Sequence, residues 1–465
     1  MDIILDGGFP RNSLILLAGN PGTGKTVFSA QFLYRGAVDY DENSVYVSFA
    51  ENRETFFENM KAFGFDFESL EKKGKFSYLD LLTVKERAVP TILNLIIKET
   101  RKVKARRLVV DSYSALAQSF QEPIDVRIIV HTVLGKIVRD MGCTTLLIEE
   151  VPIGRTEIGF GIEEFVADGV IRLRTSELEG RLFRDLELLK LRGARLKERK
   201  LAFTLEGGFK VFPPFKPKPI KRPKRFQPIP DPPGMYSTGI KALDKALGGG
   251  LPKGFVMLLE LDEKISTLIY HLFIAPMASN FVLQGRGVID IPSSGVDPAL
   301  FHKYIGVYGG TEEEWRRYAR IISVRSLKPP EDFPNVIVVK GEDWREDLDK
   351  VLEASKQLTA ETGQPNLSIV GVDTLITLYG EKHCEEILNL SATDARRAGA
   401  PLIAIVKAGF RKLAVKLSPI ADIYLRLTMK HGCPLLYGIK PRTPLYAVEM
   451  DVSKGYPQPK LTPIL

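Results

Sequence analysis

The chain has 465 residues, 44% of them hydrophobic, which is too long for a single core and predicts two or three domains. Its formal net charge of +8 permits contact with nucleic acid but does not require it. The three cysteines form no C-x-x-C pair and no apolar run reaches ~18–20 residues, which excludes a disulfide framework and a membrane span and favours a cytoplasmic protein.

The clearest motif lies at residues 19–26, which fit the phosphate-binding pattern G-x-x-x-x-G-K-[ST] at every defined position. An apolar run at 14–18 predicts a buried strand before it, and residues 27–33 predict a helix after it. In this context backbone N–H groups and the helix N-terminus converge on phosphate oxygens. Lys25 would reach the β and γ phosphates, and Thr26 would hold Mg²⁺. The predicted ATP-binding residues are Gly19, Asn20, Pro21, Gly22, Thr23, Gly24, Lys25 and Thr26.

Strands and helices alternate through the following part of the chain. Strands are predicted at 45–49, 76–80, 108–110 and 144–148, and helices at 55–63, 91–101 and 125–141. A stretch of alternating strands extends from 170 to 212. Such alternation indicates an α/β fold with a mainly parallel central sheet that is covered by helices on both faces.

Carboxylates follow several of these strands, at the sheet edge where ligands bind in such folds. Asp111 ends the strand at 108–110 and is predicted to contribute to the nucleotide site and to hold Mg²⁺ together with Thr26. Hydrolysis also needs a carboxylate that orients the attacking water. Glu51 is the favoured candidate, and Glu149 or Glu150 are the alternatives because they end the strand at 144–148.

The composition changes between residues 213 and 233, where nine prolines and six lysines or arginines occur. Prolines remove backbone donors and like charges repel, so an extended linker at 213–235 is expected. It would separate a first domain at 1–212 from a second at 236–465. Its cations could contact nucleic acid or an acidic partner, or it could be a solvated hinge.

Beyond this segment the chain repeats itself, because residues 247–254 echo residues 5–12 at an offset of 242. Residues 255–260 then predict a second apolar strand. At the same offset Gly19 becomes Leu261 and Lys25 becomes Thr267, while the nearby Asp262 would repel a triphosphate. The second domain is therefore predicted to be a degenerate copy that keeps the fold and lacks a functional P-loop.

These motifs resemble the KaiC-like branch of the RecA/Rad51 ATPase superfamily. The matching stretches are 7–10, 19–26, 47–49, 109–112, 163–170 and 189–193, with weaker matches at 237–240, 243–244 and 248–252. The resemblance implies two tandem RecA-like domains and a source among archaea, where this branch is common. It also implies a homo-oligomer, often a hexameric ring, in which Lys190 and Arg192 act as catalytic residues on the neighbouring subunit's γ-phosphate.

The chain departs from this family in two places. The family usually has paired glutamates after its second strand, but here Ala50 precedes Glu51, which predicts slow hydrolysis. In the second domain Asp373 resembles Asp111 and residues 440–442 resemble 190–192, without a P-loop for them to serve. The expected function is a KaiC-like ATP-binding protein, a slow ATPase that regulates its own assembly or an unidentified protein partner. The alternative is a RecA/Rad51 paralogue that acts on DNA.

Overall fold

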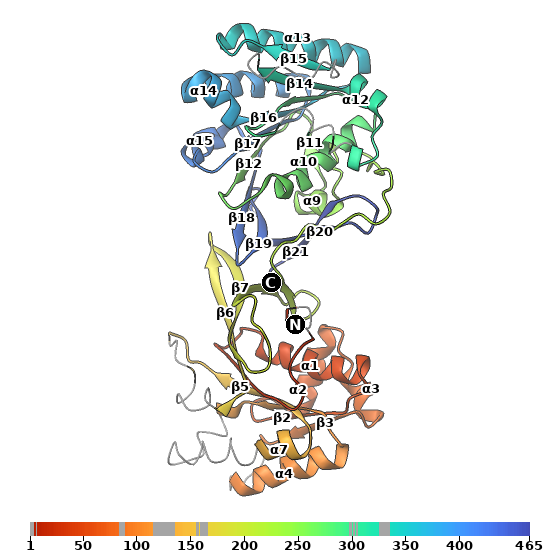
Figure 1. Ribbon diagram of the computed structural model, residues 1–465, viewed down its shortest axis with the longest axis vertical. Helices are drawn as coiled ribbons and strands as arrows, with labels where there is room; N and C mark the ends of the chain where they lie inside the picture. The colour runs from red at the N-terminus through yellow and green to blue at the C-terminus, as the bar shows by residue number, and fades with distance from the viewer. Residues whose placement is uncertain are drawn as a thin grey trace. The chain divides into compact units, whose positions relative to one another are not determined.

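The structure is a computed structural model that describes residues 4–5, 7–82, 89–114, 135–154, 158, 166–296, 300, 303, 306–324 and 335–465. The chain folds into two compact units (Figure 1). The first unit consists of Met1–Pro214 together with Pro463–Leu465, and the second consists of Phe215–Thr462.

Within its described residues, the first unit contains a 9-stranded sheet in the order β3-β2-β4-β5-β1-β6-β7-β8-β9. The strands from β3 to β6 in this order are parallel, and the last three are antiparallel. The bounds are β1 (Leu14–Gly19), β2 (Ser44–Ser48), β3 (Phe76–Asp80), β4 (Arg107–Asp111), β5 (Thr144–Glu150), β6 (Gly169–Leu178), β7 (Arg181–Leu191), β8 (Lys200–Thr204) and β9 (Lys210–Phe212).

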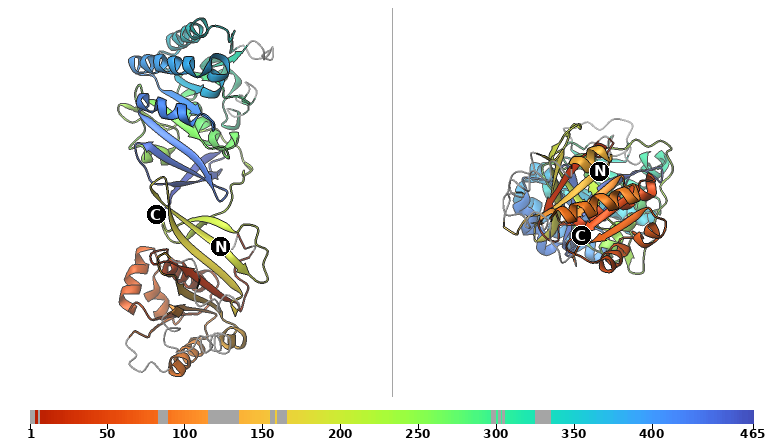
Figure 2. Two further views of the ribbon diagram at one scale, coloured as in Figure 1. Left: turned by 90° about the vertical axis from the view of Figure 1, so that its left-hand side faces the viewer. Right: turned by 90° about the horizontal axis from the view of Figure 1, so that it is seen from below.

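Helices cover both faces of this sheet (Figures 1 and 2). One face carries α1 (Lys25–Asp39), α2 (Arg53–Ala62) and α3 (Phe67–Lys72), and the other carries α4 (Val89–Val103) and α7 (Gly135–Asp140). Both faces are apolar because successive side chains of a strand alternate: Ile15 and Leu17 pack on the α1 side, and Leu14 and Leu16 on the α4 side. Residues 125–134 of the helix predicted at 125–141 lie outside the described residues.

The described residues of the second unit form a 10-stranded sheet in the order β15-β14-β13-β16-β17-β12-β18-β19-β20-β21. Its strands are β12 (Val256–Leu261), β13 (Val288–Ile291), β14 (Ala319–Val324), β15 (Val336–Val339), β16 (Leu367–Gly371), β17 (Leu402–Val406), β18 (Ile423–Lys430), β19 (Cys433–Lys440), β20 (Tyr446–Asp451) and β21 (Gln458–Pro463). A small separate sheet pairs β10 (Met235–Tyr236) with β11 (Leu251–Pro252).

The helices of the second unit flank this sheet as in the first unit. They are α9 (Lys241–Ala246), α10 (Thr267–Val282), α12 (Glu312–Tyr318), α13 (Trp344–Thr362), α14 (Val372–Ala398), α15 (Arg411–Leu417) and the short η2 (Ser418–Ile420). When β12 is matched to β1, the strand order equals that of the first unit apart from the additional edge strand β15. Moreover, β12 and α10 each begin 242 residues after β1 and α1, at 256 against 14 and 267 against 25. Both units are therefore α/β, with a mainly parallel sheet between helices.

The proline-rich segment that we expected to be a free linker at 213–235 instead packs within the second unit from Phe215 onward. Phe226 is only 1% exposed, and its N–H donates to the carbonyl of Tyr308 (2.8 Å). The N–H of Ile229 donates to the side chain of Asn280 (2.7 Å). The prolines do remove donors, but the remaining N–H groups find partners on the second unit, and one buried aromatic ring anchors the segment.

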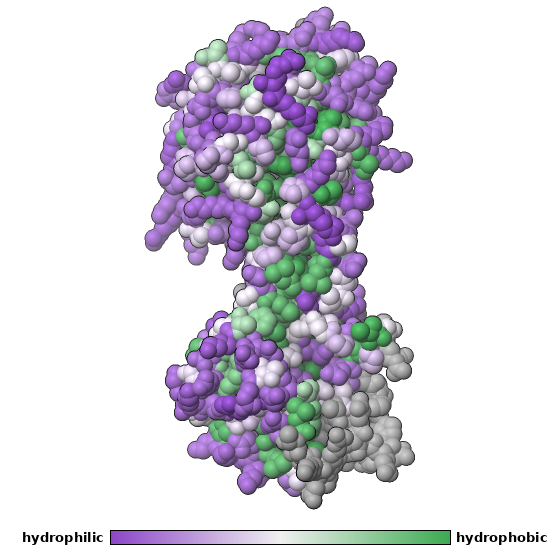
Figure 3. Space-filling model, turned by 180° about the vertical axis from the view of Figure 1, so that it is seen from behind, coloured by the Kyte–Doolittle hydropathy of each residue, from purple (hydrophilic) through white to green (hydrophobic). Residues whose placement is uncertain are grey.

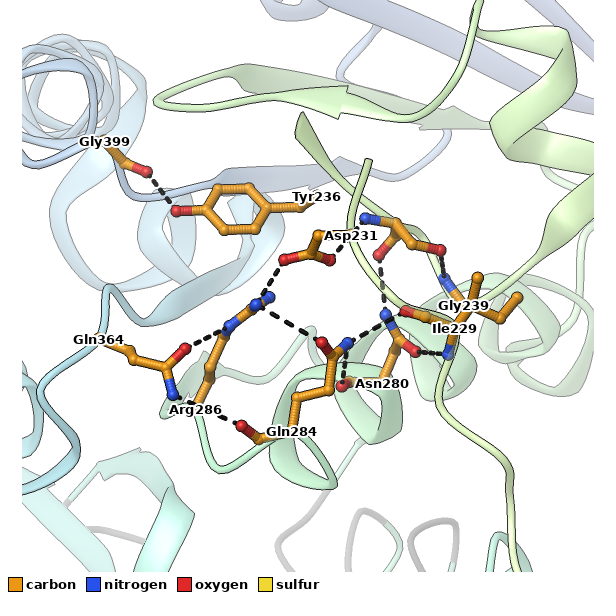
Figure 4. Close-up of polar contacts among 10 residues, drawn as sticks. Ile229, Asp231, Tyr236, Gly239, Asn280, Gln284, Arg286, Gln364 and Gly399 are labelled. Carbon is orange, nitrogen blue, oxygen red and sulfur yellow. Dashed lines mark hydrogen bonds and ion pairs between the residues drawn. The ribbon is translucent and has the colours of Figure 1, made fainter. Parts of the chain in front are cut away.

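The end of this segment is held by a polar network (Figure 4). The carboxylate of Asp231 pairs with the guanidinium of Arg286, whose Nε donates to Gln364 (2.8 Å). The hydroxyl of Tyr236 donates to the carbonyl of Gly399 (2.8 Å). These contacts connect residues more than fifty positions apart, so no local sequence pattern indicates them.

On the face drawn in Figure 3, hydrophilic side chains dominate the surface of the second unit, as expected for a unit whose apolar residues fill its own core. In the part of the chain that the structure describes, no helix is both long and apolar enough to cross a membrane. Cys143, Cys384 and Cys433 are buried free thiols.

Candidate nucleotide-binding site

The P-loop, residues 19–26, joins the carboxyl end of β1 to the first turn of α1. Two of its glycines adopt the left-handed backbone conformation, Gly22 with φ 75° and Gly24 with φ 95°. At Gly19 a Cβ atom would lie 2.6 Å from Thr23 Oγ1 and 2.8 Å from the carbonyl of Leu173. Glycine is therefore required at this point for the loop to turn so closely over the sheet.

Lys25 lies over this loop with only 8% of its surface exposed. Its Nζ donates to the carbonyls of Gly19 (2.9 Å) and Asn20 (3.0 Å). Burial lowers the pKa of Lys25, while the neighbouring carboxylates of Glu150 and Asp111 act in the opposite direction. The ammonium group is thus held at the loop by carbonyls that a phosphate can replace as its partner.

Thr26 and Asp111 meet at the base of the loop, where the threonine Oγ1 donates to Asp111 Oδ2 (3.3 Å). The hydroxyl of Tyr46 donates to the same oxygen. Burial raises the pKa of Asp111, although the hydrogen bonds from Tyr46 and Thr26 oppose the shift. The pair therefore places one hydroxyl and one carboxylate side by side.

This donor set can hold a magnesium ion that arrives with a nucleotide. Among the described residues there is no group of three His, Cys, Asp or Glu side chains that could cage a metal alone. Mg²⁺ in nucleotide sites keeps several waters and takes phosphate oxygens in addition to one or two protein ligands. A threonine hydroxyl and one buried carboxylate below a P-loop fit that requirement.

Glu51 lies just beyond β2, on the same sheet edge as Asp111, which is level with Ser48 in the strand register. Its carboxylate accepts a hydrogen bond from the side chain of Asn59 (2.6 Å), and its backbone carbonyl accepts one from Tyr78 (2.8 Å). Burial raises the pKa of Glu51, and the charge of Asp111 adds to that shift. A carboxylate with a raised pKa is suited to accept a proton from water.

The two alternatives to Glu51 lie at the carboxyl end of β5, directly beside the start of the P-loop. In the register Glu149 is level with Ala18, and Glu150 is level with Gly19. Glu149 is 4% exposed, whereas Glu150 is exposed and its N–H donates to Ser114 (2.8 Å). The structure thus brings three carboxylates besides Asp111 to the edge that carries Lys25.

Arg192 is at the opposite end of the sheet. The N–H of Arg192 donates to the carbonyl of Asp168 (2.7 Å), and its guanidinium lies 3.7 Å from the Asp168 carboxylate. The Asp168 carboxylate also accepts a hydrogen bond from the N–H of Leu14, the first residue of β1. The P-loop, in contrast, begins at Gly19, the last residue of β1. A six-residue strand separates these points by about 17 Å. Arg192 is therefore not brought to the P-loop of its own chain, and Lys190 is level with Leu16, about 10 Å before that loop.

Sequence reasoning missed two features of the site. Tyr46, which reads as one more apolar strand residue, is buried and contacts Asp111. The side chain of Asn20 donates to the carbonyls of Val151 (2.9 Å) and Pro152 (3.0 Å), so it fixes the P-loop to the end of β5. Both contacts join segments far apart in the sequence, so no local signal could have indicated them.

The second unit differs at the equivalent edge, and strand register corrects the resemblance between Asp373 and Asp111. In the first unit Val110 is level with Leu16 of β1, and in the second unit Val370 is level with Leu258, the equivalent residue of β12. The next residue in each strand is therefore also equivalent, so Gly371 takes the place of Asp111. Asp373 is two residues farther on, in the first turn of α14. The error arose because a match of short apolar strands cannot detect a shift of two residues.

Ion pairs within the chain fill this edge of the second unit. Lys407 Nζ lies 3.1 Å from the buried carboxylate of Asp373, which also accepts from the N–H of Ser294 (3.0 Å). The buried Glu260 accepts from the hydroxyl of Tyr424 (2.6 Å) and lies 3.3 Å from the guanidinium of Arg426. These charges are already paired inside the protein.

Comparisons with known proteins identify the family of the first unit. Residues 1–215 match the family model described as KaiC ATPase, and residues 225–311 match the model described as GvpD basic region 2. In this chain the latter segment carries as many acidic as basic residues.

Among proteins, the chain is 34% identical over 226 residues to a UPF0273 protein of Methanocaldococcus jannaschii, covering 44% of this chain and 91% of that protein. It is 33% identical over 271 residues to the circadian clock oscillator protein KaiC of Synechococcus elongatus, covering 55% of this chain and only 50% of that protein. The solved structure of a KaiC-like protein from Pyrococcus horikoshii matches 46% of this chain and 95% of its own, at 36% identity and a TM-score of 0.42. The chain therefore spans about half the length of the circadian clock protein but nearly all of the shorter relatives, and it belongs to the KaiC-like ATPase family.

Proposed function

We propose that the first unit binds Mg-ATP and hydrolyses it slowly, and that its nucleotide state controls assembly or the binding of a partner protein. The observation that carries this proposal is the arrangement of Lys25 over the P-loop, with Thr26 and Asp111 in contact below it. The glycine backbone and helix N-terminus would bind the phosphates, and Mg²⁺ would offset their charge. Ala50 stands where the family has another glutamate, so turnover should be slow.

The placement of Lys190 and Arg192 supports an active site that is shared between subunits. Arg192 lies near the amino end of β1, about 17 Å from the loop at its carboxyl end, so it cannot serve its own P-loop. Lys190 is level with Leu16 in the register, about 10 Å before that loop. Head-to-tail contact between copies would bring this end of one sheet to the P-loop of the next. Such contacts form closed rings when the rotation closes, and a hexamer is one such ring. A guanidinium supplied by the neighbour would then offset charge that develops on the transferred phosphoryl group.

Mixing two inactive variants tests this proposal. Arg192→Ala should retain nucleotide binding and lose turnover, whereas Lys25→Ala should keep a competent Arg192 but leave its own P-loop empty. In mixed assemblies some P-loops of the first variant would face an arginine of the second, so ATPase activity should partly return. Activity should also rise with protein concentration. If mixed assemblies form, as seen by light scattering, but remain inactive, Arg192 does not act between subunits.

A DNA-acting paralogue is the alternative from the sequence. Its physical basis is the run of exposed cations between Lys216 and Lys224, which the packing of the segment leaves at the surface. Such a run binds nucleic acid weakly and with strong dependence on salt. We expect no stimulation of ATPase activity by single-stranded DNA. Stimulation that survives replacement of these cations by serine would favour the DNA-acting alternative.

A further inference from the structure

Residues Pro463–Leu465, here called the tail, start at the last residue of β21 but belong to the first unit. The side chain of Ile464 is buried, with 1% exposed. Thr204, at the end of β8, donates through Oγ1 to the carbonyl of Pro463 (2.7 Å) and accepts from the N–H of Leu465 (3.3 Å). The tail is thus fixed by its backbone and by one buried apolar side chain.

Arg184, in the middle of β7, connects this tail to the P-loop. Its Nε donates to the backbone oxygen of Leu465 (2.8 Å), and its Nη1 donates to the carbonyl of Gly22 in the loop (3.0 Å). Figure 1 marks the end of the chain beside β7. A guanidinium carries its N–H donors on separate nitrogens in one rigid plane, so Arg184 holds the two backbone oxygens with two different nitrogens, whereas a lysine would have to donate to both from one nitrogen.

A second contact joins the same two regions. The N–H of Leu205, next to Thr204, donates to the backbone oxygen of Leu465 (3.3 Å). The side chain of Leu205 lies 2.9 Å from where a Cβ atom on Gly24 would stand. The turn that carries the tail therefore also touches the P-loop at its second left-handed glycine.

From these contacts we propose that the tail is a positioning element of the nucleotide site, and that Arg184 couples its docking to ATP binding. The proposal rests on ATP binding at the P-loop. By holding the Gly22 carbonyl, Arg184 keeps that oxygen directed away from the phosphates. The carbonyl oxygen carries a partial negative charge and would otherwise repel them. The docked tail in turn holds Arg184 by its other nitrogen. Because the tail continues directly from β21, nucleotide binding in the first unit affects a segment covalently joined to the second.

Coupling of this kind is reciprocal, because a ligand that favours tail docking must itself bind more tightly when the tail is docked. The test uses the full chain and the slowly hydrolysed analogue ATPγS. Hydrogen exchange at the amides of Ile464 and Leu465 should slow when ATPγS binds. Arg184→Ala should raise this exchange without nucleotide and should weaken ATPγS binding by ~5–10-fold, within the usual range of coupling between sites. Thr204→Val, which alters tail contacts and leaves Arg184 in place, should weaken binding in the same direction.

The control is Arg101→Ala, on the exposed surface of α4, which should change neither quantity. Arg184→Lys keeps the charge but would have to replace Nε and Nη1 by a single nitrogen, so we expect that it does not restore binding. If Arg184→Ala and Thr204→Val both leave ATPγS affinity unchanged, the coupling is wrong. If the unaltered chain binds no ATPγS, the proposed function fails instead. Docking of the tail can be tested independently of nucleotide binding. If Arg184→Ala leaves hydrogen exchange at the Leu465 amide unchanged in the absence of nucleotide, Arg184 does not hold the tail.

Discussion

At the carboxyl edges of the two sheets, equivalent positions carry different charges. In the first unit β5 ends in Glu149 and Glu150, beside Ala18 and the P-loop. In the second, Glu260 is the equivalent of Ala18, and Lys407 follows β17 at the position of Glu150. One edge has carboxylates around a single buried lysine, and the other has cations paired with buried carboxylates.

A further exchange occurs one strand away. In the first unit the hydroxyl of Tyr46 donates to Asp111. In the second unit the strand register places Asp290 at the position of Tyr46 and Gly371 at the position of Asp111. The same order of strands is therefore compatible with a nucleotide site and with an edge closed by internal ion pairs. Buried charges are costly unless they are paired, and the buried carboxylates of the second edge have cations of the same chain as partners. The two edges therefore differ in their charged residues as well as in the glycines of the P-loop.

The largest expected effect concerns the number of nucleotides per chain. If only the first edge binds ATP, calorimetry should give a ratio near one, and Lys25→Ala should abolish binding because the phosphates lose their buried cation. A matched Lys264→Ala variant, in the equivalent loop of the second unit, should bind as the unaltered chain does. A ratio near two in the unaltered chain that falls to one in Lys25→Ala would show that the second edge is also a nucleotide site.

The next largest effect is on ATP turnover, and it distinguishes the roles of Glu51 and Glu150 at the first edge. Glu51→Gln should lower ATP turnover by ~10²-fold, within the range for a general base, while nucleotide binding persists. Glu150→Gln serves as the matched variant, and we expect it to change turnover less. Steady-state ATPase rates with separately measured affinities decide between them. A larger loss in Glu150→Gln would transfer the proposed role from Glu51 to the end of β5.

The smallest effect is on stability and tests the buried acid of the second unit. Burial raises the pKa of Asp290 to about 8. Between its ordinary pKa and this value the folded chain keeps a proton that the unfolded chain has lost, so stability falls as pH rises, at up to about 1.4 kcal/mol per pH unit. Asp290→Asn should remove this dependence and therefore gain stability relative to the unaltered chain at pH 8 more than at pH 5.

Urea unfolding of the Asp290→Asn variant at the two pH values is the measurement. The control is Glu263→Gln, which replaces an exposed acid of the same unit and should follow the unaltered chain at both. Parallel loss of stability in Asp290→Asn and the unaltered chain would mean that the carboxyl group of Asp290 is ionised in the folded protein.

Local sequence patterns identified those parts of the molecule that local chemistry determines. The P-loop, the strand that ends in Asp111 and the offset of 242 residues all follow from short runs of side chains. The position of Arg192 could not be read in this way, because it depends on β7 running antiparallel to β6 and returning toward the start of β1. The docking of residues 215–235 depends on one buried ring, Phe226, within a composition typical of exposed segments.

Because the tail belongs to the first unit, the backbone crosses between the two units twice, after Pro214 and after Thr462. A recombinant fragment that ends at residue 214 would lack the tail, and the buried hydroxyl of Thr204 would lose its acceptor at Pro463. A hydrogen bond of this kind contributes about 0.5–1.5 kcal/mol to stability. The boundary that the sequence indicates, before the proline-rich segment, is thus a poor choice for expressing the first unit alone. A fragment of this unit needs the tail restored through an engineered connection from residue 214 to Pro463.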